Sequence, residues 1–312
     1  MGQVRHLSSF ACALCLLAGC FISFDLPQSD GPTGIGGASS SSVVSSASVG
    51  GQGGSVTGEG GTGGQGGTGG TNVPSETWTE AVDADAPLLW WRLNDGAAGE
   101  EKDRAGDDDP GNYSGLVSPA IESGIVGDGA MAFGEDTKVF IYDSDLRVPL
   151  QFLGHASFTL EAWVSIAMGG LVRPIVSKWN KEETTVDEAG FMLRYEPDGN
   201  QGEIVFGRYR HLSNDFDSVK APFEANGTFH HVVATSRGLT NDNSEICLYV
   251  DGEPVGTCVS SAIAIADNQA SFGLNLTGAS QLAGAVDELL VYGDVLDATR
   301  VRAHYCAVVE CE

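Results

Sequence analysis

The feature that most constrains this fold is a series of short apolar runs between Leu88 and Tyr292. Runs such as LLWWRL, KVFIYD, SFTLEAWVSI, GEIVFGRYR and FHHVVATS either alternate with a period of two or are apolar throughout. Gly, Asn, Asp and Pro fall between the runs, and no long segment shows a helical period. Many short strands at this spacing predict an all-β sandwich or barrel.

The run SFTLEAWV indicates how such a strand is buried. Four alternate residues form one wholly apolar face: Phe158, Leu160, Ala162 and Val164. The other face carries Glu161 and Trp163, because successive side chains of a strand point to opposite sides. We expect one short helix, near the C-terminus, where the Asp297 carboxylate can cap the segment ATRVRAHY.

The chain before Pro74 has a different composition. The segment 31–71 consists mostly of Gly, Ser and Thr, so it cannot bury enough apolar surface to offset the entropy lost on ordering. We therefore predict a flexible linker over 20–73 and a single globular domain over 74–312. The formal net charge of −26 argues against nucleic acid or anionic lipid headgroups as partners.

The N-terminus has the pattern of an export signal. Arg5 and His6 precede the apolar stretch FACALCLLAG, which is too short to span a bilayer. The residues from Leu17 to Cys20 resemble the lipobox of bacterial lipoproteins. That resemblance implies a signal peptide over 1–19 and an acylated Cys20, carrying palmitate-type chains, as the first mature residue. Phe21 follows, where enteric-type retention signals have aspartate, so we expect an outer-membrane lipoprotein displayed at the cell surface. The alternative is an ordinary secretory leader with a chance cysteine.

Four of the seven cysteines remain after the leader and lipobox are set aside: Cys247, Cys258, Cys306 and Cys311. An even number of cysteines in an exported chain indicates disulfide bonds. In CLYVDGEPVGTC, pairing Asp251 with Pro254 across the turn places Cys247 opposite Cys258. Cys306 is then left to pair with Cys311. A metal site is the alternative, but only His304 lies near these cysteines in sequence.

The order of the motifs points to a family. FTLEAWV, HHVVAT followed by LYVDG, and GAVDELLVY together resemble the LamG-like, concanavalin A-like lectin/glucanase jelly rolls over residues 77–305. The resemblance implies two stacked antiparallel sheets with roughly a dozen strands. It also implies that partners bind at the loops of one sandwich edge or on the concave sheet.

The same resemblance implies a structural calcium site. The turn carrying Asp136 and the strand carrying Asp287 would lie together and supply the hard oxygen ligands that Ca²⁺ prefers. The alternative is that Asp287 only hydrogen-bonds to a neighbouring turn. The acidic run DRAGDDDPGN is a second candidate, although a charged loop is usually just solvated.

The sequence shows no catalytic residues. Retaining glycosidases need two carboxylates about 5 to 5.5 Å apart, which alternate positions of one strand can supply. Glu161 stands alone on its strand, and the adjacent Asp287 and Glu288 should point to opposite faces. His231 could act as a base, but a histidine alternating with valines is more often a hydrogen-bonded core residue. We therefore expect no enzyme and no catalytic cofactor. A glycosidase that uses Glu161 with an unusual second acid is the alternative.

Four tryptophans of the domain lie in or beside apolar runs. Trp90 and Trp163 sit inside strands and are expected in the core. Trp179 lies at a strand-to-loop edge and is the candidate ligand-binding platform. The leading hypothesis is a surface-tethered, non-catalytic adhesion lipoprotein that recognises a carbohydrate or a protein partner. A structural envelope protein is the remaining alternative.

Overall fold

The structure is a computed structural model, and the residues it describes all lie in the unit Gly66–Glu312. These residues are 75–94, 100–106, 109–115, 118–120, 124–125, 129–134, 137–152, 156–167, 169–179, 189–198, 201–209, 216–240, 243–262, 271–276 and 282–311. The proposed lipidation site Cys20 and the linker over 20–73 fall outside them. The domain boundaries therefore stay predictions.

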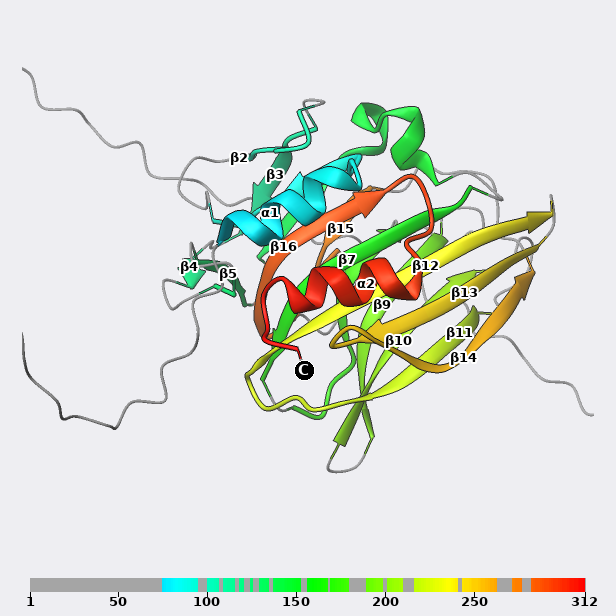
Figure 1. Cartoon of the computed structure of the whole chain (residues 1–312). Helices are drawn as coiled ribbons and strands as arrows, with labels where there is room; N and C mark the ends of the chain where they lie inside the picture. The colour runs from blue at the N-terminus through cyan, green and yellow to red at the C-terminus, as the bar shows by residue number, and fades with distance from the viewer. Residues whose placement is uncertain are drawn as a thin grey trace, which may run out of the picture. The chain divides into compact units, whose positions relative to one another are not determined.

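Sixteen strands in these ranges form two eight-stranded antiparallel sheets (Figure 1). Sheet A comprises β1 (Leu89–Trp91), β4 (Ser118–Ala120), β5 (Ala130–Phe133), β7 (Phe158–Ile166), β12 (Phe229–Thr240), β13 (Asn243–Val250), β14 (Glu253–Ala262) and β16 (Gly284–Tyr292). Sheet B comprises β2 (Glu100–Glu101), β3 (Gly111–Ser114), β6 (Lys138–Ile141), β8 (Arg173–Trp179), β9 (Ala189–Asp198), β10 (Gln201–Tyr209), β11 (Phe216–Phe223) and β15 (Phe272–Leu274). The predicted all-β, two-sheet antiparallel sandwich is confirmed.

The strand order places β7 near the middle of sheet A. The order is β14-β13-β12-β7-β16-β5-β4, with β1 also paired to β16, and sheet B runs β11-β10-β9-β8-β15-β6-β3-β2. Two short 3-10 helices, Asp143–Asp145 and Val148–Gln151, connect β6 to β7. Half of the strand pairs join strands that are not consecutive in the chain, such as β7 with β12 and β16, as expected for a jelly roll.

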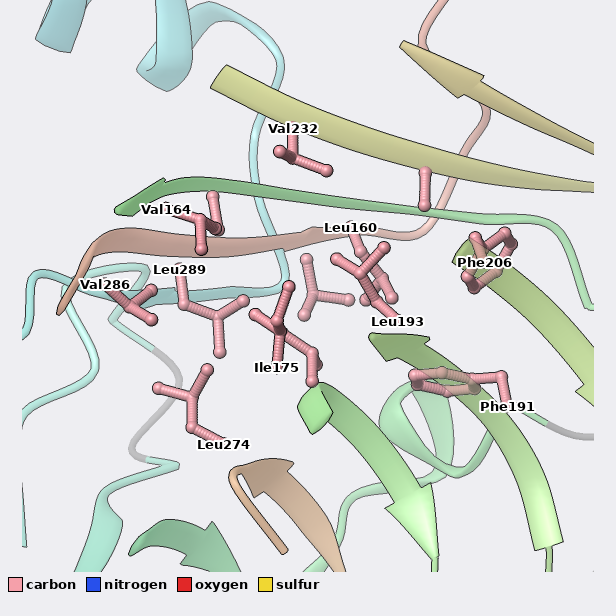
Figure 2. Packing of buried hydrophobic residues seen from close by; sticks show 14 of the residues in the cluster. Leu160, Val164, Ile175, Phe191, Leu193, Phe206, Val232, Leu274, Val286 and Leu289 are labelled. Atoms are coloured by element: carbon pink, nitrogen blue, oxygen red, sulfur yellow. The ribbon is translucent and has the colours of Figure 1, made fainter. Parts of the chain in front are cut away.

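The main core lies between the two sheets (Figure 2). Side chains of sheet A and sheet B point toward one another there: Leu160, Val164, Val232, Val286 and Leu289 from sheet A, and Ile175, Phe191, Leu193, Phe206 and Leu274 from sheet B. The four apolar residues predicted to share one face of β7 all belong to this core. The alternation read from the sequence is therefore confirmed.

The other face of β7 is buried as well, because two helices cover it. Helices α1 (Ser75–Ala84) and α2 (Ala298–Cys306) lie across sheet A on the side away from sheet B (Figure 1). Trp78 and Val82 of α1 pack with Trp90, and Val301 of α2 joins the same cluster. This side of sheet A is called its outer face below. Among the described residues, no helix is long and apolar enough to cross a membrane.

Only one of the two helices was expected. Helix α2 begins after Asp297, whose carboxylate accepts a hydrogen bond from the Arg300 amide at 2.9 Å, as predicted. Helix α1 was missed. Its apolar residues Trp78 and Val82 stand four apart, which is the spacing of one helical face, but the segment is only ten residues long.

The structure contains both expected disulfide bonds, Cys247–Cys258 and Cys306–Cys311. The hairpin that carries the first one is tighter than predicted. Val250 pairs with Glu253, and Asp251 and Gly252 both have positive φ, so the turn has two residues instead of pairing Asp251 with Pro254. An irregularity between Ile246 and Leu248 then restores the predicted register, which brings Cys247 beside Cys258.

A bulge in β16 gives Asp287 and Glu288 a different orientation from the one predicted. Asp287 pairs with Trp163 and Leu290 pairs with Glu161, so β16 has one extra residue there. Glu288 takes that place with a φ of 56°. Its carboxylate then bonds to Trp90 and Arg92, while Asp287 lies opposite Trp163. Both acids lie on the outer face of sheet A instead of on opposite faces.

Candidate functional site

The residues predicted to bind ligand lie partly outside the described structure. Trp179 ends β8, and its side chain is not among the described ones. Asp136 is likewise outside the described residues. Trp90 and Trp163 are fully buried and His231 is buried and hydrogen-bonded, so the core interpretation of all three is confirmed.

Asp287, the other predicted calcium ligand, is buried on the outer face of sheet A. Its Oδ2 accepts a hydrogen bond from the backbone amide of Ile125 at 2.7 Å. This agrees with the alternative prediction, in which Asp287 only hydrogen-bonds to a neighbouring turn. In the described part of the chain, no group of three or more His, Cys, Asp or Glu side chains is placed to hold a metal ion. The calcium site therefore stays a prediction.

The outer face of sheet B, the side away from sheet A, is not covered by either helix. On β9 the residues Phe191, Leu193 and Tyr195 point into the core, so Arg194 and Glu196 point outward. Four charged side chains form a network on this face: Arg194, Glu196, Glu203 and Lys220. Arg194 Nε donates to Glu196 at 2.8 Å, and Lys220 Nζ donates to Glu196 at 2.6 Å and to Glu203 at 3.3 Å.

The hydrogen bonds of this charged network shift the pKa values of Glu196 and Lys220. Partial burial would raise the pKa of the Glu196 carboxyl, but hydrogen bonds from Lys220 and Arg194 outweigh burial and lower it. The hydrogen bond to Glu196 raises the pKa of Lys220. These shifts favour the charged forms of Glu196 and Lys220, and the network presents both donors and acceptors at the surface of the sheet.

Two half-buried aromatic side chains lie beside this network. The rings of Tyr209 and Phe216 are 4.7 Å apart, and the Arg194 guanidinium lies 4.5 Å from the Phe216 centroid. Phe216 lies against Gly207, because a Cβ at that position would come within 2.5 Å of the ring. A glycine in the middle of a strand therefore lets the ring lie on the sheet. Tyr209, Phe216 and Arg194 are called the aromatic cluster below.

Gly207→Ala tests this packing. We expect a loss of about 1–3 kcal/mol in the free energy of unfolding, because the new methyl group clashes with the Phe216 ring and with the Asp217 carbonyl oxygen. Urea denaturation measures the loss, and the NMR shifts of the Phe216 ring protons report its displacement. Gly170→Ala is the matched control, since a Cβ there meets nothing within 4 Å. An unchanged Phe216 ring in Gly207→Ala would contradict the packing argument.

A second polar cluster lies buried on the outer face of sheet A. Glu161 is fully buried, and its Oε1 bonds to His231 Nε2 at 2.9 Å. Its Oε2 bonds to His304 Nδ1 at 2.9 Å and accepts the Tyr292 hydroxyl at 3.0 Å. His304 Nε2 continues to Asp85 Oδ2 at 2.8 Å. The sequence placed Glu161 alone because its three partners lie 70 to 143 positions away.

The charges of this cluster are coupled. Burial alone would raise the pKa of the Glu161 carboxyl, but the charge of His304 and the hydrogen bonds from His231 and His304 lower it far below its ordinary value. Glu161 is therefore a carboxylate at any ordinary pH. It is fully buried beneath the two helices, which argues against a glycosidase that uses Glu161.

Comparison with known families agrees with the sandwich. A family model described as the concanavalin A-like lectin/glucanases superfamily matches residues 134–302, which is more than half of the chain. The chain belongs to this superfamily. The match confirms the resemblance seen in the motifs. No curated protein matches the chain.

Solved receptor-binding domains have a similar fold. The receptor binding domain of botulinum neurotoxin C/D mosaic serotype has a TM-score of 0.53 and 12% identity, covering 71% of this chain and 51% of that one. The binding domain of botulinum neurotoxin DC, in complex with rat synaptotagmin II, has a TM-score of 0.52 and 11% identity, covering 72% and 52%. The chain spans about half the length of these structures. At such identities the likeness shows the fold alone.

A third structure is that of botulinum neurotoxin type C, whose cell entry is described as dependent on two ganglioside molecules. It has a TM-score of 0.50 and 12% identity, covering 73% of this chain and 53% of that one. A similar fold is thus present in a binding domain solved in complex with rat synaptotagmin II and in a neurotoxin whose cell entry depends on gangliosides.

Proposed function

We propose that this protein is a non-catalytic adhesion module that binds a cell-surface glycan on the outer face of sheet B and is anchored in the outer membrane through a lipid on Cys20. The observation that carries the binding proposal is the Phe216 ring laid against Gly207, with Tyr209 beside it and charged groups adjacent. A protein receptor is the alternative partner.

The chemistry of this face suits a sugar. The half-buried rings of Tyr209 and Phe216 offer apolar surface to the C–H groups of a pyranose, and the Arg194 guanidinium over the Phe216 ring adds hydrogen-bond donors beside it. The carboxylates of Glu196 and Glu203 accept hydrogen bonds from hydroxyl groups, and Arg194 and Lys220 donate them. Because the ion pairs already fix these side chains, little further entropy is lost when a ligand binds.

The fold supports a binding role of this general kind. The solved domains that share it include one bound to synaptotagmin and one from a toxin that depends on gangliosides. Fold alone does not transfer a ligand, so the proposal for this chain rests on its own aromatic cluster. The lipid anchor rests on the lipobox-like residues from Leu17 to Cys20.

The test is a glycan-array screen of the full chain, run with calcium and with a chelator, followed by titration of any hit. Phe216→Ala should weaken binding about tenfold or more, since an aromatic anchor contributes at least one to two kcal/mol to such a contact. Tyr142→Ala is the matched control, because Tyr142 is a 52% exposed aromatic residue that follows β6, away from the aromatic cluster.

The outcomes separate the candidate roles. Loss of binding in Phe216→Ala but not in Tyr142→Ala supports the proposed face. Binding that needs calcium and ignores Phe216 would move the site to the predicted Asp136 and Asp287 region. No glycan signal in either condition, with the chain shown to be folded, would overturn glycan recognition and leave a protein receptor or a structural envelope role.

A further inference from the structure

His304 joins two carboxylates that come from different parts of the chain. Its Nδ1 lies 2.9 Å from Glu161 Oε2, in the centre of sheet A, and its Nε2 lies 2.8 Å from Asp85 Oδ2, directly after α1. A carboxylate only accepts hydrogen bonds, so both ring nitrogens must donate. The geometry therefore requires His304 to be a protonated imidazolium.

His231 binds the same carboxylate without this requirement. Its Nε2 bonds to Glu161 Oε1 at 2.9 Å, and its Nδ1 has no partner among the described residues. A neutral ring with one proton on Nε2 satisfies that arrangement. The two histidines of the cluster thus differ, and only His304 needs a second proton.

The groups packed around His304 fix the balance of charge. They are Glu161 on β7, His231 on β12, Tyr292 on β16, Arg300 on α2 itself and Asp85 after α1. Arg300 donates to Asp85 from two nitrogens and to the carbonyl of Ala81. With His304 charged, two carboxylates face two cations. When His304 is neutral, one buried carboxylate loses its counterion and faces a nitrogen lone pair.

We propose that His304 is a proton-dependent latch that fastens helix α1 to sheet A and weakens when its imidazolium loses a proton. Asp85 directly follows α1. Among these contacts, His304 connects Asp85 to sheet A, whereas Arg300 connects Asp85 to α2. Deprotonation removes the link from Asp85 to Glu161. The packing of Trp78 and Val82 against the sheet and the hydrogen bonds from Arg300 of α2 to Asp85 and Ala81 then remain to hold α1 in place.

The direction of the titration agrees with this geometry. Burial disfavours the imidazolium, but the Glu161 carboxylate and then Asp85 outweigh burial and raise the pKa of His304 above the ordinary value of 6.5. The latch is therefore fully formed below pH 6.5 and is lost as the pH rises through the raised pKa. Glu161 limits it only in strong acid, because its own pKa is lowered.

The test measures hydrogen exchange of the α1 amides, 75–84, in the full chain between pH 6 and 10, corrected for intrinsic exchange rates. Because His230 also has a raised pKa, from its hydrogen bond with Asp251, every protein carries His230→Gln. We expect protection of α1 to fall by about tenfold or more across the titration of His304, because a buried carboxylate then loses its counterion. His304→Gln should be weakly protected throughout and show no such step, since one amide cannot bridge both carboxylates.

His231→Gln is the matched control and should keep the step, because that ring does not need a second proton. Asp85→Asn is a further variant in case His304→Gln does not fold. An asparagine can offer either an oxygen or an NH₂ group, so the step should move to lower pH or vanish. Nitrogen-15 spectra of the His304 ring should show two protonated nitrogens at pH 6.5. One protonated nitrogen at that pH, or the same α1 step in His304→Gln, overturns the proposal.

Discussion

Glu161→Ala should lower the free energy of unfolding by about 3–5 kcal/mol, because it leaves a buried cation without its counterion. The alanine removes the acceptor used by His231, His304 and Tyr292 at once. All of these hydrogen bonds are buried, so water cannot replace the missing oxygens without opening the layer of helices. Urea denaturation at pH 6.5, followed by tryptophan fluorescence, measures the loss.

Glu196→Ala is the control for this experiment. Glu196 also binds two cationic side chains, but it lies at the surface of sheet B, where an ion pair contributes about 0–1 kcal/mol. The difference between the two variants isolates the effect of burial. If both variants lost the same stability, the cluster beneath the helices would not be the strong element that its geometry indicates.

Cys20→Ser should abolish incorporation of a palmitate analogue and release the protein from the membrane fraction. The effect is expected to be complete, because the proposed anchor consists of acyl chains on this one residue and each buried methylene contributes about 0.8 kcal/mol. Metabolic labelling followed by cell fractionation measures both results.

Cys15→Ser is the matched control, since Cys15 lies in the same leader and precedes the proposed cleavage site. It should leave labelling and fractionation unchanged. Labelling that survives in Cys20→Ser would place the lipid elsewhere or refute the lipoprotein assignment. The adhesion proposal for sheet B would stand or fall separately, through the glycan array.

The fold could be predicted from the sequence because its signals are local. Alternation in SFTLEAWV identified the core face of β7, and Asp297 marked the start of α2. The predictions were wrong or incomplete where contacts with neighbouring strands and helices determine the local backbone structure. The bulge at Glu288 puts a glutamate at positive φ, which no residue preference announces, and it turned both acids of β16 to one face. Helix α1 is stabilised by packing on sheet A more than by its own sequence.

The candidate sites were less accessible to prediction, for a similar reason. The sequence indicated no contact among the three residues of the buried cluster. Glu161 was interpreted as an isolated acid, His231 as a core residue, and His304 as a histidine near cysteines. Their common contact exists only after β7, β12 and α2 come together. Gly207 and Phe216 belong to neighbouring strands, and the close approach of ring and glycine depends on the register between β10 and β11. Neither residue signals it alone.

The two helices and the aromatic cluster lie on opposite sides of the sandwich. The described chain enters the domain through α1, on the outer face of sheet A, while the aromatic cluster looks out from the opposite side of the sandwich. A ligand bound at the aromatic cluster would therefore be separated from both α1 and α2 by the full thickness of the sandwich.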